Sequence, residues 1–202
     1  MRVLNYDVEV ELTEPLLGTV PKNKEVYTQY IESKRPEDQA PGGAVAEAET
    51  VEDLEEKGWT GFHSDETGLF VYDYYIKGFF KNAANILKDE FSVPAFRSKI
   101  NDYVFVYPRR VHLGGLKEPS DILERPIRVM TMQGPRVSII RSDLVAAGTV
   151  IKFRLEYIEN KKFKPEFLEQ LMEYGKRQGF GQWRNGSYGR FVVKKFELVS
   201  EG

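Results

Sequence analysis

Hydrophobic and polar residues alternate along much of this chain in short runs, and two longer segments repeat with the helical period. Residues 2–12 alternate with period two, which predicts a half-buried strand. Further strands are predicted at 69–72, 101–107, 126–132, 136–141, 149–158 and 191–199. The strands at 126–132 and 136–141 flank Gly134-Pro135, so we expect them to form a hairpin.

Two segments have apolar residues on one helical face. The first runs from Ile76 to Phe91, before Pro94, and the second begins at Pro165. Together with the strands they give the order β-α-β-β-α-β with additions. This order predicts an α+β fold of the ferredoxin-like type, with extra strands, in which two helices cover one face of the sheet. RNA-recognition (RRM) domains have this arrangement and bind RNA with the uncovered face of the sheet, so we expect an RRM-like fold.

A long segment of different composition follows the first strand. Residues 19–66 are rich in Ala, Glu, Asp, Pro and Gly, and only a short helix is expected, at 50–57. We therefore divide the chain into a folded domain, 1–18 with 67–202, and an acidic, partly flexible insertion, 19–66.

The net charge of −2 conceals an asymmetry. Residues 1–66 contain 6 Lys and Arg against 16 Asp and Glu, a balance of −10, and the remainder has a balance of +8. This split predicts a body that binds a polyanion and an acidic segment that contacts a neighbouring subunit or protein. The alternative is that the acidic segment of one copy docks on the basic surface of another.

Composition excludes several classes of site. The absence of cysteine excludes disulfides and thiolate chemistry, and two histidines leave little for zinc, so we expect no metal and no cofactor. The sequence has no apolar run of about 20 residues and enters a strand at once, which predicts a cytoplasmic protein without membrane contact.

Residues 179–191 are rich in the residue types that hold polyanions. Four glycines, two arginines, a tryptophan and a tyrosine lie there between the second helix and the last strand. Glycine allows close approach of the backbone, arginine pairs with phosphate, and aromatic rings stack on bases. The alternative is a hairpin loop whose aromatic residues pack on the core.

Two segments resemble the RAMP superfamily of CRISPR-associated proteins, in particular its guide-RNA-binding backbone subunits. One is Tyr74-Tyr-Ile-Lys-Gly-Phe-Phe-Lys-Asn-Ala-Ala84, which is similar to the family's Lys-Gly step into the first helix. The other is the glycine-rich loop. Tyr74-Tyr75 stand where that family more often has Pro-Gly-Ser. The resemblance implies binding of single-stranded RNA, with single-stranded DNA as the alternative, within a multi-subunit complex or an array of copies.

The candidate nucleic-acid contacts follow from these motifs. A phosphate cradle near the start of the first helix is expected from Lys77 and Lys81, which share a helical face, together with the Gly78 backbone, or these are ordinary solvated lysines. The loop contributes arginines for phosphate, glycines for close approach and two rings for stacking or core packing: Gly181, Trp183, Arg184, Gly186, Tyr188, Gly189 and Arg190. A basic ridge of Arg109, Arg110, His112 and Arg136 either follows nucleic acid or protects a strand edge.

No catalytic residue is assigned, and we do not expect an enzyme. One alternative function is that of a metal-independent endoribonuclease of the RAMP type, with His112 near Tyr107 and Lys117, or a cleaving carboxylate from Asp38 or Asp65. Another is a structural or assembly protein that uses the same fold for protein contacts.

Overall fold

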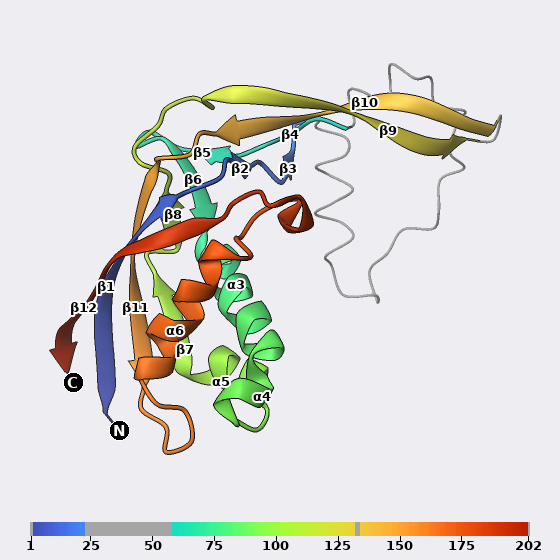
Figure 1. Cartoon of the computed structure of the whole chain (residues 1–202). Coiled ribbons are helices and arrows are strands. Elements are labelled where there is room, and N and C mark those ends of the chain that lie inside the picture. The colour runs from blue at the N-terminus through green and yellow to red at the C-terminus, as the bar shows by residue number, and fades with distance from the viewer. Residues whose placement is uncertain (1, 23–57, 132–133, 202) are drawn as a thin grey trace, which may run out of the picture.

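The first and last strands of the chain lie side by side in a four-stranded sheet. Its order is β12 (Phe191–Glu201), β1 (Val3–Leu12), β11 (Val150–Ile158) and β7 (Val104–Tyr107). All three neighbouring pairs are antiparallel. The computed structural model describes residues 2–22, 58–131 and 134–201, and it has a mixed α+β architecture (Figure 1).

Helices cover one face of this sheet (Figure 1). They are α3 (Asp73–Ile86), α4 (Lys88–Phe91), α5 (Phe96–Tyr103) and α6 (Glu166–Glu173), with 3₁₀ turns at Tyr174–Lys176 and Arg184–Gly186. Every second residue of β1 is buried beneath them, as the period-two pattern predicts: Leu4, Tyr6, Val8, Val10 and Leu12. The helices contribute Phe80, Phe96, Ile100, Leu168 and Leu171 to the same core.

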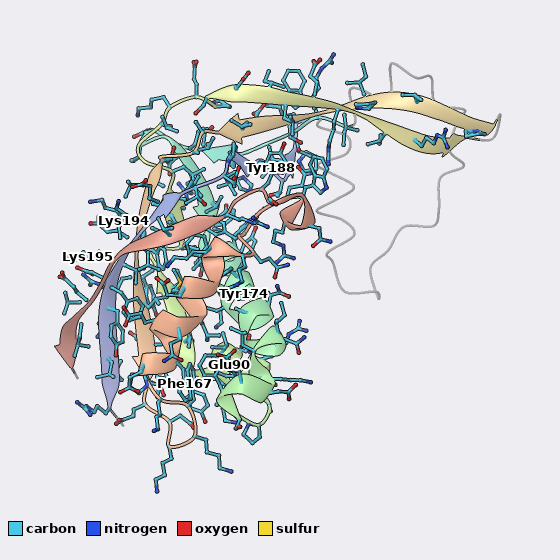
Figure 2. The ribbon with its side chains drawn as sticks, in the orientation of Figure 1. Glu90, Phe167, Tyr174, Tyr188, Lys194 and Lys195 are labelled. Atoms are coloured by element: carbon cyan, nitrogen blue, oxygen red, sulfur yellow. The ribbon has the colours of Figure 1, made fainter. Side chains whose placement is uncertain are left out.

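The opposite face of the sheet carries paired charges. Glu9 on β1 accepts from Lys152 at 2.8 Å, and Asp7 accepts from Arg154 at 3.1 Å. A register shift in the β1–β12 pairing leaves Lys194 as an extra residue, and Lys194 forms an ion pair with Glu11. Figure 2 shows Lys194 and Lys195 on the side away from the helices. Because its cations already have carboxylate partners, this face is a poorer polyanion surface than the predicted fold suggested.

A long hairpin extends from one end of the body (Figure 1). It consists of β9 (Asp121–Thr131) and β10 (Gly134–Val145), paired antiparallel as the sequence predicted. At its base, β10 also pairs with β2 (Leu16–Leu17) and β4 (Thr60–Gly61), and β4 pairs with β3 (Val20–Pro21). A third sheet contains β5 (His63–Ser64), β6 (Leu69–Tyr72) and β8 (Arg110–His112).

The two ends of the insertion meet at the base of the hairpin. Buried Asp143 on β10 accepts a hydrogen bond from Trp59 Nε1 at 2.9 Å and forms an ion pair with Lys22 at 2.8 Å. The described parts of the insertion, 19–22 and 58–66, contribute the strands β3, β4 and β5. Its remaining residues, 23–57, lie outside the described residues, so the helix expected at 50–57 and the flexibility stay predictions.

Several element boundaries differ from the sequence predictions, and the hairpin strands are longer than the expected 126–132 and 136–141. The first helix begins at Asp73 rather than at Ile76, the first apolar residue of the helical pattern. Its first turn contains Asp73 and the two tyrosines, and an acidic side chain is favourable there because of the helix dipole. It ends at Ile86, before α4. Residues 101–103, expected in a strand, close α5 because Phe96 and Ile100, four residues apart, share a buried helical face.

In the described part of the chain, no helix combines the length and the apolar character needed to cross a bilayer.

Candidate nucleic-acid interface

The two motifs that the sequence singled out line one surface hollow. It has a volume of about 430 Å³ and lies between α3 and the glycine-rich loop. Gly78 and Lys81 contribute from α3, and Gly181 and Arg184 from the loop. Its other lining residues are Tyr74, Tyr75, Asn82, Asn85, Arg97 and Phe180. Three cations and two amides line it without a carboxylate among the described residues, which is the side-chain chemistry that holds phosphate.

Lys77 and Lys81 have different surroundings. Lys77 Nζ donates to the Asn101 backbone oxygen at 2.8 Å and lies 4.6 Å from the centroid of the Phe105 ring. Burial, aided by the Lys81 charge, lowers the pKa of Lys77 from its ordinary value. Lys77 is therefore directed toward β7, whereas Lys81 lines the hollow and its Nζ also lies 3.5 Å from Asn101 Oδ1.

Gly78 leaves space in the hollow and does not provide a free helix terminus. Because α3 begins at Asp73, Gly78 lies in the second turn, where backbone N–H groups are bonded within the helix. A cradle of free N–H groups at Gly78, as the sequence suggested, does not follow from this position. A Cβ at Gly78 would meet nothing within 4 Å, so the missing side chain widens the hollow.

The loop glycines allow two parts of the loop to pack together. A Cβ at Gly179 would lie 1.7 Å from the Gly189 oxygen, and one at Gly189 would lie 2.0 Å from the Phe180 oxygen. Gly181 has φ +92°, and its Cβ would lie 2.6 Å from Leu16. The close approach that these glycines permit is thus within the protein, and the expected approach to a ligand backbone stays a prediction.

Trp183 links the loop to the long hairpin. It is 44% exposed, and its ring stacks on Tyr188 with centroids 5.2 Å apart. The guanidinium of Arg125, on β9, lies 3.9 Å from the centroid of the Trp183 ring. A Cβ on Gly186 would lie 2.8 Å from the same ring. Figure 2 shows Tyr188 beside the base of the hairpin. Protein groups therefore occupy much of the ring surface that the sequence offered for a base.

A polar network holds the same loop. Gln182 Oε1 accepts hydrogen bonds from Thr60 Oγ1 at 3.2 Å and from Ser142 Oγ at 3.1 Å. Thr60 is on β4 and Ser142 on β10, so the loop is joined to the end of the insertion and to the hairpin. This network fixes the backbone beside Arg184.

Arg190 closes the loop onto the first strand. Its backbone oxygen accepts from Thr13 N at 2.8 Å and from Glu14 N at 3.3 Å. Its Nε atom is buried and has no hydrogen-bond partner within the described part of the chain. Arg190 is at the base of the loop and is not among the residues that line the hollow.

The basic ridge divides into two parts. Arg109, Arg110 and His112 lie at β8, where the Arg109 guanidinium is 5.5 Å from the centroid of the Tyr72 ring. Arg136 pairs with Val129 near the turn of the hairpin, and its side chain lies outside the described residues. The structure therefore does not bring Arg136 together with the other three.

Asp65 organises the part of the ridge at β8. Its carboxylate accepts from His112 Nε2 at 3.0 Å and from Arg110 at 3.2 Å, and from the backbone N–H groups of Thr67 and Gly68. The His112 hydrogen bond, with smaller contributions from Arg110 and the backbone, lowers the pKa of Asp65 to about 2. An ionised carboxylate only accepts, so the proton of this hydrogen bond belongs to His112 Nε2.

Three residues near these clusters were missed in the sequence. Tyr74 and Arg97 line the hollow, and Arg125 contacts Trp183. The sequence signal for Tyr74 was its position in the motif, where the resembling family more often has Pro-Gly-Ser. Arg97 and Arg125 had no local signal because they reach the site through tertiary packing. No group of three His, Asp or Glu suited to a metal occurs in the described ranges.

Comparisons with known proteins found similarity at the level of structure. No known family matches the sequence, and no curated protein matches it. A chain in the cryo-EM structure of the Type III-B Cmr-beta bound to cognate target RNA superposes with a TM-score of 0.53 at 13% identity. The likeness is one of fold. The match covers 98% of the present chain and 61% of that chain, so the protein spans less than two thirds of its length.

Proposed function

We propose that this protein binds the sugar-phosphate backbone of single-stranded nucleic acid, RNA in preference to DNA, as a subunit of a larger assembly. The observation that carries the proposal is the hollow in which Lys81, Arg97 and Arg184 come together from three separate segments. Three cations in a hollow whose described lining residues include no carboxylate are suited to phosphate oxygens.

The fold supports the same proposal. The strand order β12-β1-β11-β7, antiparallel throughout, with α3 and α6 as the two helical connections, favours a ferredoxin-like split βαβ arrangement. The structurally similar chain comes from Type III-B Cmr-beta bound to cognate target RNA. With the two motifs in Tyr74–Ala84 and 179–191, this similarity favours a RAMP-type subunit that works beside other subunits or copies of itself.

Binding of this kind depends on salt and little on sequence. Lysine and arginine contacts to phosphate release counterions, and the slope of log K against log salt is about −0.7 per contact for single strands. Loss of the two contacts from Lys81 and Arg184 should therefore reduce the slope by about 1.4.

Fluorescence anisotropy tests the proposal directly. A labelled single-stranded RNA of about 30 nucleotides, and the DNA of the same sequence, are titrated with wild type and with Lys81→Ala/Arg184→Ala at low and physiological salt. The double variant should bind about 10- to 100-fold more weakly, with the smaller salt slope.

The matched control is Lys161→Ala/Lys162→Ala. Both lysines are exposed in the turn before α6, so this variant removes the same charge away from the hollow. Equal losses in the two double variants would indicate a general charge effect, and no binding of either nucleic acid by wild type would overturn the proposal and favour an assembly protein.

The hydrogen bond between Asp65 and His112 favours a second candidate function, metal-independent RNA cleavage. A carboxylate that holds the Nε2–H tautomer leaves Nδ1 as the basic nitrogen of His112, able to take the proton of a ribose 2′-hydroxyl. The test is incubation of RNA with EDTA. Cleavage with 2′,3′-cyclic phosphate ends that disappears in His112→Ala supports this function, and unchanged cleavage in that variant, or none in wild type, removes it.

A further inference from the structure

Three tyrosines form a continuous stack where β6 passes into α3. The ring centroids of Tyr72 and Tyr74 are 5.4 Å apart, and those of Tyr74 and Tyr75 are 5.0 Å apart. The interplanar angles are 21° and 28°, so the three rings are close to parallel. Tyr75 is fixed further by a hydrogen bond between its hydroxyl group and Thr19. The stack is therefore held in place before any ligand arrives.

Tyr74 is the accessible ring of this stack. It is 51% exposed, although it contacts two other rings, and it lines the same hollow as Lys81 and Arg184. Centroid separations of 5.0 and 5.4 Å at small interplanar angles mean that the neighbouring rings are offset and overlap the Tyr74 ring only in part. The exposed remainder of the ring, beside a cationic hollow, is a surface on which a planar group can stack.

Cations lie at both ends of the stack. At one end is the hollow with Lys81, Arg97 and Arg184, and at the other the Arg109 guanidinium lies 5.5 Å from the centroid of the Tyr72 ring. Alternation of cationic groups with exposed rings is the pattern by which proteins follow a single strand, with phosphates on the cations and bases on the rings.

The Asp73 side chain, between the two cationic ends of the stack, argues against a phosphate beside the tyrosine rings themselves. Asp73 lies between Tyr72 and Tyr74 in the first turn of α3, and its Oδ1 atom is buried without a hydrogen-bond partner among the described residues. A carboxylate at this position disfavours a phosphate, whereas a neutral base carries no such penalty.

We propose that Tyr74 is a base-stacking site, at which a nucleobase lies on the tyrosine ring while the adjoining phosphate enters the hollow beside Lys81 and Arg184. This inference rests on the proposed nucleic-acid binding and adds the class of group recognised next to the phosphate site. It also gives a physical role to the two tyrosines at the helix entry.

The test compares RNA with a polyanion that has no bases. Wild type, Tyr74→Ala, Tyr74→Leu and Tyr74→Phe are titrated against the labelled RNA, and unlabelled inorganic polyphosphate then competes for the same protein. Because stacking on one ring is worth about 1–3 kcal/mol, Tyr74→Ala and Tyr74→Leu should lose about 5- to 150-fold in RNA affinity. Tyr74→Phe, which keeps the ring, should stay within about twofold of wild type in RNA affinity. The inhibition constant of polyphosphate, which measures the affinity for a polyanion without bases, should be unchanged in all variants.

Controls separate the failure of this inference from that of the proposed function. Ile86→Ala, which removes a 46% exposed side chain from the same helix outside the hollow, should bind RNA as wild type does. RNA affinity that falls in Lys81→Ala/Arg184→Ala but not in folded Tyr74→Ala or Tyr74→Leu overturns the stacking site alone. Equal losses for RNA and polyphosphate also overturn it, and no RNA binding by wild type overturns both proposals.

Discussion

Arg125 and Trp183 lie face to face, with the guanidinium carbon 3.9 Å from the centroid of the indole ring. Arg125 belongs to the long hairpin and Trp183 to the glycine-rich loop. This contact joins the hairpin to the loop segment that also carries Arg184.

Loss of the contact between Arg125 and Trp183 should change both the thermal stability of the protein and the fluorescence of Trp183. A cation–π pair is worth about 0.5–2 kcal/mol, so Arg125→Ala should lower Tm by a few degrees, about 1–8 °C, and shift the Trp183 emission to longer wavelength. Arg128→Ala, which removes an exposed arginine from the same strand, is the control. The Trp183→Phe variant identifies which part of the emission comes from Trp183. If the wavelength of that emission is the same in Arg125→Ala as in wild type, the contact is contradicted.

Substitution of Lys22 and substitution of Asp143 should reduce the stability of the protein by different amounts. The Asp143 side chain is 3% exposed, whereas that of Lys22 is 44% exposed. Lys22→Met leaves a buried carboxylate without its cation and should cost about 3 kcal/mol. Asp143→Asn leaves a cation that water can solvate and keeps an acceptor for Trp59, so it should cost less. Urea unfolding of both variants measures the two losses, and a larger loss in Asp143→Asn would show that the pair is not organised in this way.

Gly78 in α3 and Gly189 in the glycine-rich loop should have opposite effects on stability when replaced by alanine. Gly78→Ala places a methyl group in open space inside a helix and should stabilise by about 1 kcal/mol. The same methyl narrows the hollow, so RNA affinity should fall as stability rises.

Gly189→Ala should unfold the loop instead. Its Cβ would lie 2.0 Å from the Phe180 oxygen at a φ of +70°, so we expect a loss of more than about 2 kcal/mol. Thermal unfolding and anisotropy on both glycine variants distinguish the outcomes. A stabilised Gly78→Ala that binds RNA as tightly as wild type would mean that the ligand stays away from this part of the hollow.

The Asp65 carboxyl should titrate at about pH 2 in the folded protein. Its folded pKa is below the ordinary value of 3.8, so its interactions stabilise the fold above pH 3.8 and are lost as the pH falls toward about 2. Because the His112 hydrogen bond is the largest cause, His112→Ala should raise this pKa toward 3.8. An NMR titration of the Asp65 carboxyl carbon measures both midpoints, and an unchanged midpoint in His112→Ala would leave Arg110 and the backbone as the cause.

Local patterns determined most of the elements. The alternation in residues 2–12, the turn signal at Gly134-Pro135 and the helical spacing after Pro165 each depend on neighbours a few residues apart, and the structure has a strand, a hairpin and a helix there. Where a pattern was ambiguous, tertiary contacts decided. Residues 101–103 became helical because Phe96 and Ile100 pack as one face.

The sequence by itself also marked both motifs of the candidate interface, because glycine, arginine and tyrosine have distinctive chemistry wherever they occur. It did not determine that Lys81 and Arg184 share one hollow or that Lys77 faces β7. Nor did it show that the loop glycines pack against each other. Lys81 and Arg184 are about a hundred residues apart in the chain, and only the packing of α3 and the glycine-rich loop against the common sheet brings them within reach.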